Sequence, residues 1–181
     1  MKLSIVIPAY NEELAISEIV TRCLDARETL KRDAGLSAVE VLVVDDGSRD
    51  GTNAIAAKFK EIKLVTHPVN RGYGAALMTG FEAASGELLS FLDADGTCDP
   101  LAFVELVRVL KSGDAQLSIG NRLHAGSKMP RVRELGNRIY AQIISRLSGV
   151  PVGDTASGMR VFRRELLARL APLPTGLHFT P

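Results

Sequence analysis

The sequence contains no tryptophan, few other aromatic residues and only two cysteines. Aromatic residues make up 5% of the 181 residues, and basic residues are not interleaved with them. Nucleic-acid-binding proteins commonly combine basic and aromatic side chains, so we expect no nucleic-acid partner. Two cysteines are too few for a disulfide framework, and we expect Cys23 and Cys98 to stay reduced.

Long hydrophobic runs are also missing. No apolar run approaches the ~18 residues that a membrane-spanning helix needs, and the run over residues 3–7 is too short for a signal peptide. We therefore expect a cytoplasmic protein. Apolar residues make up 46% of the chain and charged residues 24%, a composition that excludes a disordered or fibrous protein.

The length predicts a single domain over residues 1–181. Residues 171–181 carry no pattern of a closing helix or strand, and we expect the chain to be truncated there. The net charge of +1 combines −6 over residues 1–120 (12 Lys/Arg, 18 Asp/Glu) with +7 over residues 121–181 (10 Lys/Arg, 3 Asp/Glu). This division favours an acidic half that holds cations and a basic half that meets an anion, although uneven surface decoration would give the same count.

Short apolar runs alternate with helical patterns along the chain. The runs predict strands over residues 3–7, 39–44, 63–65, 88–92 and 115–119, with helices near 12–31, 51–60, 73–84 and 100–112. Beyond residue 120, the pattern predicts a helix over 131–147, a strand over 159–162 and a helix over 164–170. Alternation of strand and helix predicts an α/β fold, with a mainly parallel sheet sandwiched by helices.

Polar clusters follow three predicted strands and open one predicted helix. They are Pro8–Glu12, Asp45–Ser48, Asp93–Gly96 and Asn70–Ala75. Ligands of an open parallel sheet bind beyond the carboxyl ends of its strands. We therefore expect one crevice with several carboxylates and a glycine-lined floor.

Asp93 and Asp95 are the most specific feature of that crevice. In extended backbone, residues i and i+2 point the same way, so both carboxylates could face one ion. Hard oxygen ligands suit Mg²⁺ or Mn²⁺, which in turn hold phosphate oxygens. Such pairs are also common in surface turns, but the position directly after the buried strand 88–92 favours a metal site.

Three other groups of residues allow two interpretations each. Asp45 and Asp46 could cap a turn and a helix, or Asp45 could accept hydrogen bonds from a nucleobase or ribose. Gly72 and Gly74 lack the dinucleotide and Walker A patterns; they could let backbone approach a ligand, or merely join loop to helix. The histidines lack metal-ligand spacing, and we expect them at the surface or at caps; they are His67, His124 and His178.

Five sequence blocks together resemble the family-two inverting nucleotide-sugar glycosyltransferases with the GT-A (Rossmann-like) fold. The likeness is greatest to the polyprenyl-phosphate branch, which includes the dolichol-phosphate mannose synthases. The blocks are Ile5–Glu12, Val43–Thr52, Asn70–Ala76, Phe91–Gly96 and Asp154–Arg160. Their order along nearly the whole chain is far more specific than any single block.

The resemblance implies roles for the matching positions. The nucleotide-sugar pocket would include Pro8, Tyr10, Glu12, Val43, Asp45, Gly74, Asp93, Ala94, Asp95 and Arg122. Within it, Asp93 and Asp95 would hold the metal on the donor diphosphate, and Arg122 would lie near the donor phosphates. Asp154 would lie close to the reacting centre, so the residues expected at the chemistry are Asp95, Arg122 and Asp154.

The acceptor predicted from this resemblance is a polyprenyl phosphate. A phosphate nucleophile is already ionised and needs cations rather than a base, and Arg131, Arg133 and Arg138 could supply them. An arginine-flanked helix could also rest on an anionic membrane surface, or these arginines could simply form a solvated face. We expect a hexose to move from GDP-mannose or UDP-hexose, with peripheral contact at the inner face of the membrane.

Two alternatives stay open. One is a transferase that acts on a glycan or small-molecule hydroxyl, with Asp154 as the base; the other is a nucleotide-sugar-binding module without turnover. Residues 96–98 and 131–137 depart from the mannose synthase pattern, which leaves the donor sugar and the acceptor undefined.

Overall fold

The computed structural model describes residues 1–96, 98–120, 139, 141–147, 149 and 159–170. Its strands are β1 (Lys2–Ala9), β2 (Ala38–Asp45), β3 (Lys63–Thr66), β4 (Leu88–Phe91), β5 (Leu117–Ile119) and β6 (Arg160–Arg163). Its helices are α1 (Ile16–Asp25), α2 (Arg27–Ala34), α3 (Thr52–Ala56), α4 (Tyr73–Ala83), the 3₁₀ helix η1 (Pro100–Ala102), α5 (Phe103–Lys111) and α7 (Arg164–Leu170). Residues 141–147 are also helical.

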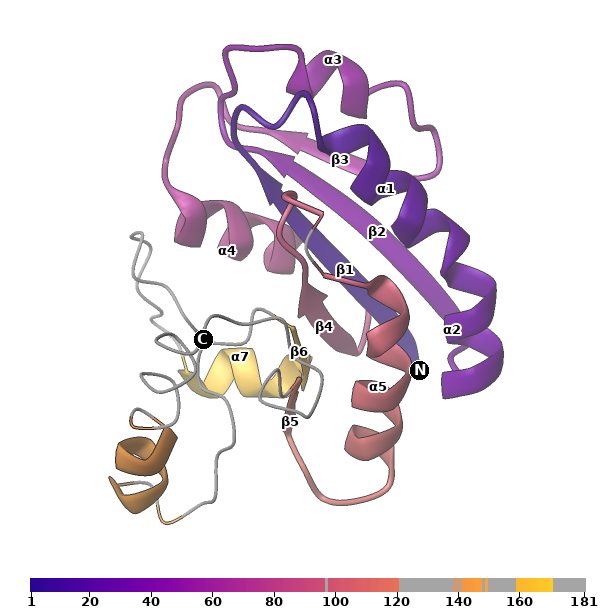
Figure 1. The fold of residues 1–181 in the computed structure, drawn as a ribbon, viewed down its shortest axis with the longest axis vertical. Coiled ribbons are helices and arrows are strands. Elements are labelled where there is room, and N and C mark those ends of the chain that lie inside the picture. The colour runs from indigo at the N-terminus through magenta and orange to yellow at the C-terminus, as the bar shows by residue number, and fades with distance from the viewer. Residues whose placement is uncertain (97, 121–138, 140, 148, 150–158, 171–181) are drawn as a thin grey trace.

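The strands form one sheet in the order β3-β2-β1-β4-β6-β5 (Figure 1). β1 pairs in parallel with β2 and β4, and β2 pairs in parallel with β3. β6 is antiparallel to both of its neighbours, β4 and β5. The prediction of a mainly parallel sheet is confirmed.

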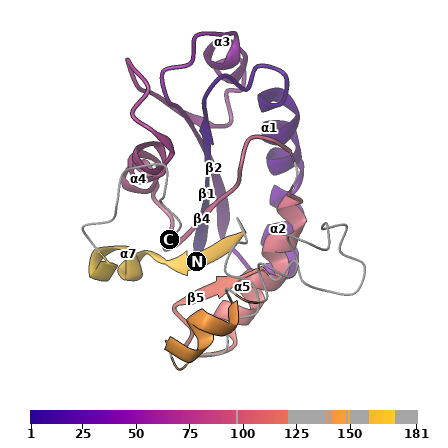
Figure 2. The ribbon, with the colours of Figure 1, turned by 60° about the vertical axis from the view of Figure 1, so that its left-hand side comes forward.

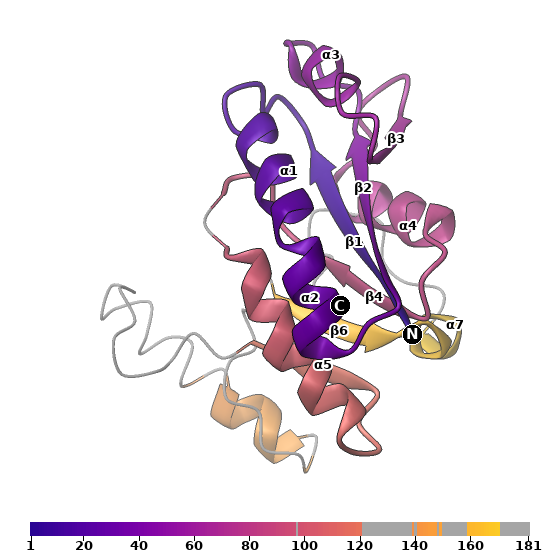
Figure 3. The same cartoon turned by 90° about the vertical axis from the view of Figure 1, so that its right-hand side faces the viewer.

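Helices cover both faces of the sheet. α1, α2 and α5 lie on one face, and α4 and α7 lie on the other (Figures 2 and 3). Alternation along β1 serves both layers: Leu3, Ile5 and Ile7 enter the cluster with α1, α2 and α5, while Val6 enters the cluster with α4. The long apolar runs in the sequence thus come from strands that are buried on both sides.

The predicted helix boundaries differ from the observed ones at three places. The helix expected over 12–31 is two helices that meet at Ala26, and the first begins at Ile16, after a turn in which the carbonyl of Glu12 accepts from the backbone N–H groups of Ala15 and Ile16. The helix expected over 51–60 ends at Ala56, where the chain tightens into three-residue turns. The helix expected over 100–112 opens with a 3₁₀ turn, which Asp99 caps through the backbone N–H of Leu101.

None of the helices in the described part of the chain is long and apolar enough to cross a membrane. The predicted strand at 159–162 and the helix at 164–170 are confirmed as β6 and α7. Of the helix predicted over 131–147, residues 131–138 and 140 lie outside the described residues.

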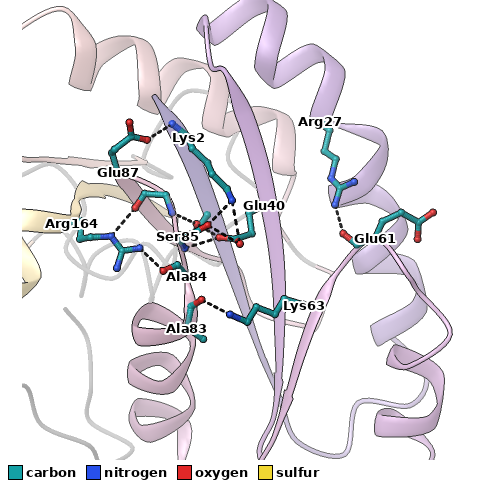
Figure 4. Close-up of polar contacts among 12 residues, drawn as sticks. Lys2, Arg27, Glu40, Glu61, Lys63, Ala83, Ala84, Ser85, Glu87 and Arg164 are labelled. Carbon is teal, nitrogen blue, oxygen red and sulfur yellow. Dashed lines mark hydrogen bonds and ion pairs between the residues drawn. The ribbon is translucent and has the colours of Figure 1, made fainter.

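A polar cluster closes the amino-terminal edge of the sheet (Figure 4). Glu40 on β2 accepts hydrogen bonds from the Ser4 hydroxyl at 2.6 Å and from the backbone N–H of Ser85 at 2.9 Å, and it pairs with Lys2 at 3.3 Å. Burial by itself would raise the pKa of Glu40, but the hydrogen bonds from Ser4, Ser85 and Lys2 lower it to about 2.

Arg164 attaches α7 to the end of α4 in the same region. Its guanidinium donates to the carbonyl oxygens of Ala84 and Gly86, both at 2.8 Å (Figure 4). It also donates to the carbonyl oxygen of Phe81 at 3.3 Å. Carbonyls at a helix C-terminus lack partners within the helix, so this arginine satisfies them. Arg164 thereby joins α7 to the C-terminal end of α4.

Gly80 sets how closely α4 packs on the sheet, and Gly80→Ala tests this. An added Cβ would lie 2.3 Å from Cγ1 of Val6. Overpacking of this kind costs about 1–3 kcal/mol, which we expect as a loss in the free energy of unfolding measured with urea. Gly113→Ala is the matched control, because its Cβ would meet nothing within 4 Å. An equal effect of both variants would contradict this account of the packing.

Glu40→Gln tests the cluster at the amino-terminal edge through its pH dependence. A glutamate in the unfolded chain titrates near ~4.3, and the folded-state pKa of Glu40 is about 2. The charged form therefore stabilises the fold fully above the unfolded pKa, and this contribution disappears as the pH falls toward the folded pKa. We expect Glu40→Gln to be less stable than the wild type at neutral pH, by an amount that shrinks in acid. The exposed Glu105→Gln is the control, and a pH-independent difference for Glu40→Gln would contradict the prediction.

Candidate functional site

A cavity of about 440 Å³ opens at the carboxyl edge of β1, β2 and β4. Its wall consists of Pro8, Ala9, Tyr10, Glu12, Asp46, Asn70, Gly72, Tyr73, Ala76, Asp93, Ala94 and Asp95. The structure therefore brings together residues from all four polar clusters that the sequence contains. Of the predicted nucleotide-sugar residues, the wall includes Pro8, Tyr10, Glu12, Asp93, Ala94 and Asp95.

Asp93 and Asp95 reach the cavity because the β4 ladder continues past the end of the strand. The backbone N–H of Leu92 donates to the carbonyl of Val6 at 2.9 Å, which keeps the segment against β1. Asp93 then accepts a hydrogen bond of 2.7 Å from the Tyr73 hydroxyl.

Arg22 on α1 holds the segment that follows Asp95. Its guanidinium donates to the carbonyl oxygen of Gly96 at 2.7 Å and to that of Cys98 at 2.8 Å. The segment that carries both aspartates is thus attached to β1, α4 and α1.

Negative charge accumulates in this cavity. The pKa of Glu12 is raised, first by burial and then by the charges of Asp95, Asp50 and Asp93. Burial, followed by the charge and hydrogen bond of Asp93, also raises the pKa of Tyr73 well above its usual range. Tyr73 therefore remains a protonated hydrogen-bond donor at neutral pH.

The donor set matches a hard divalent cation that shares its coordination sphere with a ligand. Among the described residues, no group of three or more His, Cys, Asp or Glu side chains could hold a metal ion. Mg²⁺ is usually bound through one or two carboxylates together with substrate phosphates. Asp93 and Asp95 offer the carboxylates for such a site, and the cavity beside them leaves room for the phosphates.

Asp46 fixes the glycine-containing loop on the other side of the cavity. Its carboxylate accepts hydrogen bonds from the backbone N–H groups of Arg71 at 2.9 Å and Gly72 at 2.8 Å. It also contacts Nδ1 of His67 at 2.6 Å, and Nε2 of that ring lies 2.9 Å from the Thr79 hydroxyl. Asp46 therefore anchors the loop before α4 rather than capping α3.

The expectation of a surface or capping position is wrong for His67. Its side chain is 5% exposed and bonded on both ring nitrogens. The sequence does not reveal that His67 is buried and hydrogen-bonded, because its two partners, Asp46 and Thr79, lie 21 and 12 residues away along the chain. His124 and His178 lie outside the described residues.

Three predicted binding residues lie outside the cavity wall. Asp45 is 1% exposed and accepts hydrogen bonds from the backbone N–H of Ser48 at 3.1 Å and from the Asn53 amide at 2.8 Å, so here it shapes the turn after β2. Val43 is fully buried in the core, and Gly74 is buried in the first turn of α4. Their contacts with a nucleotide stay predictions.

Some predicted site residues lie outside the described part of the chain, and some residues at the cavity were not predicted. Arg122, Arg131, Arg133, Arg138 and Asp154 lie outside the described residues. The sequence pattern predicts no individual role for Tyr73 or Asn70, although both belong to the polar cluster Asn70–Ala75. Arg160 on β6 was likewise given no role; it is 4% exposed, and its charge opposes the rise in the pKa of Tyr73.

Comparison with known proteins identifies the family of this fold and site. Residues 4–171 match the model of the family described as glycosyl transferase family 2. The chain is 33% identical over 181 residues to the low-salt glycan biosynthesis hexosyltransferase Agl6 of Haloferax volcanii, covering 98% of this chain and 42% of the relative. It is 30% identical over 171 residues to the undecaprenyl-phosphate 4-deoxy-4-formamido-L-arabinose transferase of Salmonella choleraesuis, covering 92% and 50%.

Solved structures support the same assignment. The chain superposes on glucosyl-3-phosphoglycerate synthase from Mycobacterium tuberculosis, in complex with Mn²⁺, uridine diphosphate and phosphoglyceric acid, with a TM-score of 0.71 and 27% identity over 97% of this chain and 60% of that one. The GT-A fold predicted from the resemblance is confirmed. The chain spans about half the length of the curated relatives it matches. With the family model covering nearly all of its residues, the chain belongs to glycosyl transferase family 2.

Proposed function

We propose that this chain binds a nucleotide sugar and forms the donor-binding part of an inverting transferase that moves the hexose to a polyprenyl phosphate. The observation that carries the proposal is the pair Asp93 and Asp95 at the edge of a cavity whose other wall is the loop anchored by Asp46. The name of the Salmonella relative includes an undecaprenyl-phosphate acceptor. The mycobacterial structure contains Mn²⁺ and uridine diphosphate.

The electrostatics of the cavity support a metal-dependent site. Glu12, Asp93 and Asp95 would repel a diphosphate; the pKa of Glu12 is raised first by burial and then by the charges of Asp95, Asp50 and Asp93. A Mg²⁺ or Mn²⁺ ion on Asp93 and Asp95 would neutralise the carboxylates and the departing nucleoside diphosphate. Pro8 and Tyr10 would then line the nucleoside side of the cavity.

The transfer itself requires an acceptor oxygen in line with the bond that breaks. That oxygen attacks the anomeric carbon from the face opposite the nucleoside diphosphate, so the configuration inverts as the diphosphate leaves. A phosphate oxygen needs no base, and Arg131, Arg133 and Arg138 are proposed to hold it, with Arg122 near the donor phosphates. The same arginines would favour peripheral contact with an anionic membrane, which the proposal places at its cytoplasmic face.

Asp95→Asn tests the metal and donor site. We expect the melting temperature of the wild-type protein to rise when Mn²⁺ is added together with UDP-glucose or GDP-mannose. A ligand at ~100 times its Kd stabilises by about 2.7 kcal/mol, or roughly 5–10 °C for a domain of this size. The variant should lose this metal-dependent shift because one of the two carboxylates becomes neutral.

Asp114→Asn, an exposed aspartate between α5 and β5, is the matched control and should keep the shift. A full shift in Asp95→Asn would contradict the metal site. The donor that gives the shift would also identify the base.

Arg131→Ala and Arg133→Ala test the acceptor. If these side chains hold the phosphate, each variant should raise the KM for undecaprenyl phosphate about tenfold or more, since a charge-assisted hydrogen bond is worth about 1.5–3 kcal/mol, with little change in the KM for the donor. Arg32→Ala, on the exposed surface of α2, is the control.

An unchanged acceptor KM would contradict the arginine cradle. A hydroxyl acceptor is the second candidate, because the mycobacterial structure contains phosphoglyceric acid beside uridine diphosphate. In that case Asp154→Asn would remove a base, and the pH–rate profile would lose its acidic limb.

A further inference from the structure

The Tyr73 hydroxyl connects the two walls of the cavity. Tyr73 is the first residue of α4 and follows the loop anchored by Asp46, while its hydroxyl donates to Asp93 Oδ1 at 2.7 Å. Asp93 lies on the opposite side, after β4. A single side chain thus joins the glycine-containing loop to the predicted metal carboxylate.

The backbone that carries Tyr73 is fixed before the ring begins. Gly72 has a φ of 95°, a conformation open to glycine, and its N–H donates to Asp46 Oδ2 at 2.8 Å. A Cβ on Gly47 would lie 2.5 Å from the backbone carbon of Val69, so the turn after β2 packs directly on the start of this loop. The backbone that carries the Tyr73 ring therefore has little freedom to move.

A hydrogen bond to one oxygen restricts the rotation of a carboxylate. Asp93, Asp95 and Glu12 line the same cavity, and like charges close together favour carboxylate orientations that separate them. The Tyr73 hydroxyl opposes that rotation because it holds Oδ1 toward α4. Partners of metal ligands that act in this way typically change metal affinity by 10–100-fold when removed.

We infer that Tyr73 is a positioning residue, whose hydroxyl orients Asp93 for a divalent cation and thereby couples metal binding to the order of the loop anchored by Asp46. The inference deepens the proposed function and rests on it. Tyr73 itself forms no bond to the cation. Its contribution is the orientation of the carboxylate that does.

Tyr73→Phe tests the inference, since it removes the hydroxyl and keeps the ring. The Kd of Mn²⁺ is measured from the electron paramagnetic resonance signal of free Mn²⁺, with UDP or GDP present, and the Kd of the nucleotide alone is measured without metal. We expect the Mn²⁺ Kd to rise about 10–100-fold and the metal-free nucleotide Kd to stay within twofold. In an Asp93→Asn background, adding Tyr73→Phe should change neither value further.

Ser118→Ala is the matched control, because it also removes a buried hydroxyl donor, which bonds the carbonyl oxygens of Leu106 at 2.9 Å and Val161 at 3.3 Å, far along the sheet at β5. It should keep the wild-type Mn²⁺ Kd. Melting without metal checks that each variant is folded.

The outcomes separate the inference from the function beneath it. If wild-type protein binds Mn²⁺ and Tyr73→Phe binds it equally well, the inference is wrong and the proposed function stands. If Tyr73→Phe weakens the metal-free nucleotide instead, Tyr73 is a nucleotide contact and the inference is again wrong. If the wild-type protein fails to bind Mn²⁺ both in the presence of UDP and in the presence of GDP, the proposed function itself is wrong.

Discussion

The arrangement of the cavity depends on the buried carboxylate of Asp46. This carboxylate accepts hydrogen bonds from the backbone N–H groups of Arg71 and Gly72, and it contacts the ring of His67. These bonds tie the end of β2 to the start of α4, two segments about 25 residues apart in sequence. With the loop fixed, Tyr73 meets Asp93, and the two sides of the cavity acquire a defined separation.

Electrostatics then determine what this cavity can hold. Glu12, Asp93 and Asp95 face the same space, and the pKa of Glu12 is raised by burial and by those neighbours. Two ways exist to relieve such repulsion: protonation, or a bound cation. A cation shared with a diphosphate would relieve it and would at the same time create affinity for a nucleotide, so an acidic first half of the chain is compatible with the proposed anionic donor. Residues 121–181 carry the opposite net charge, +7 against −6 over residues 1–120.

The sequence predicted the elements of the fold well, because continuous apolar runs such as residues 3–7 and 88–92 have few alternatives to a buried parallel strand. It predicted the ends of helices less well, because α1 and α2 meet at Ala26 and α3 ends at Ala56 within continuous helical patterns. In the site, the spacing of Asp93 and Asp95 and their position directly after the buried strand 88–92 predicted that both lie at the cavity, as they do. The roles of Asp46 and His67 could not be predicted, since they come from bonds to distant backbone and to α4. Asp45 was open to two interpretations, a turn cap or a nucleoside contact; the structure shows its hydrogen bonds with Ser48 and Asn53, and its contact with a nucleotide stays a prediction.

The proposal that Asp93 and Asp95 hold a divalent cation against a nucleoside diphosphate can be tested by locating the ion. In a crystal structure of the protein with Mn²⁺ and UDP or GDP, the anomalous signal of manganese gives its position. We expect one manganese peak within about 2.0–2.3 Å of carboxylate oxygens from this pair and of a diphosphate oxygen, with the nucleoside between Tyr10 and the loop anchored by Asp46. A manganese peak elsewhere, or a nucleotide bound in the cavity with no metal on either aspartate, would contradict it.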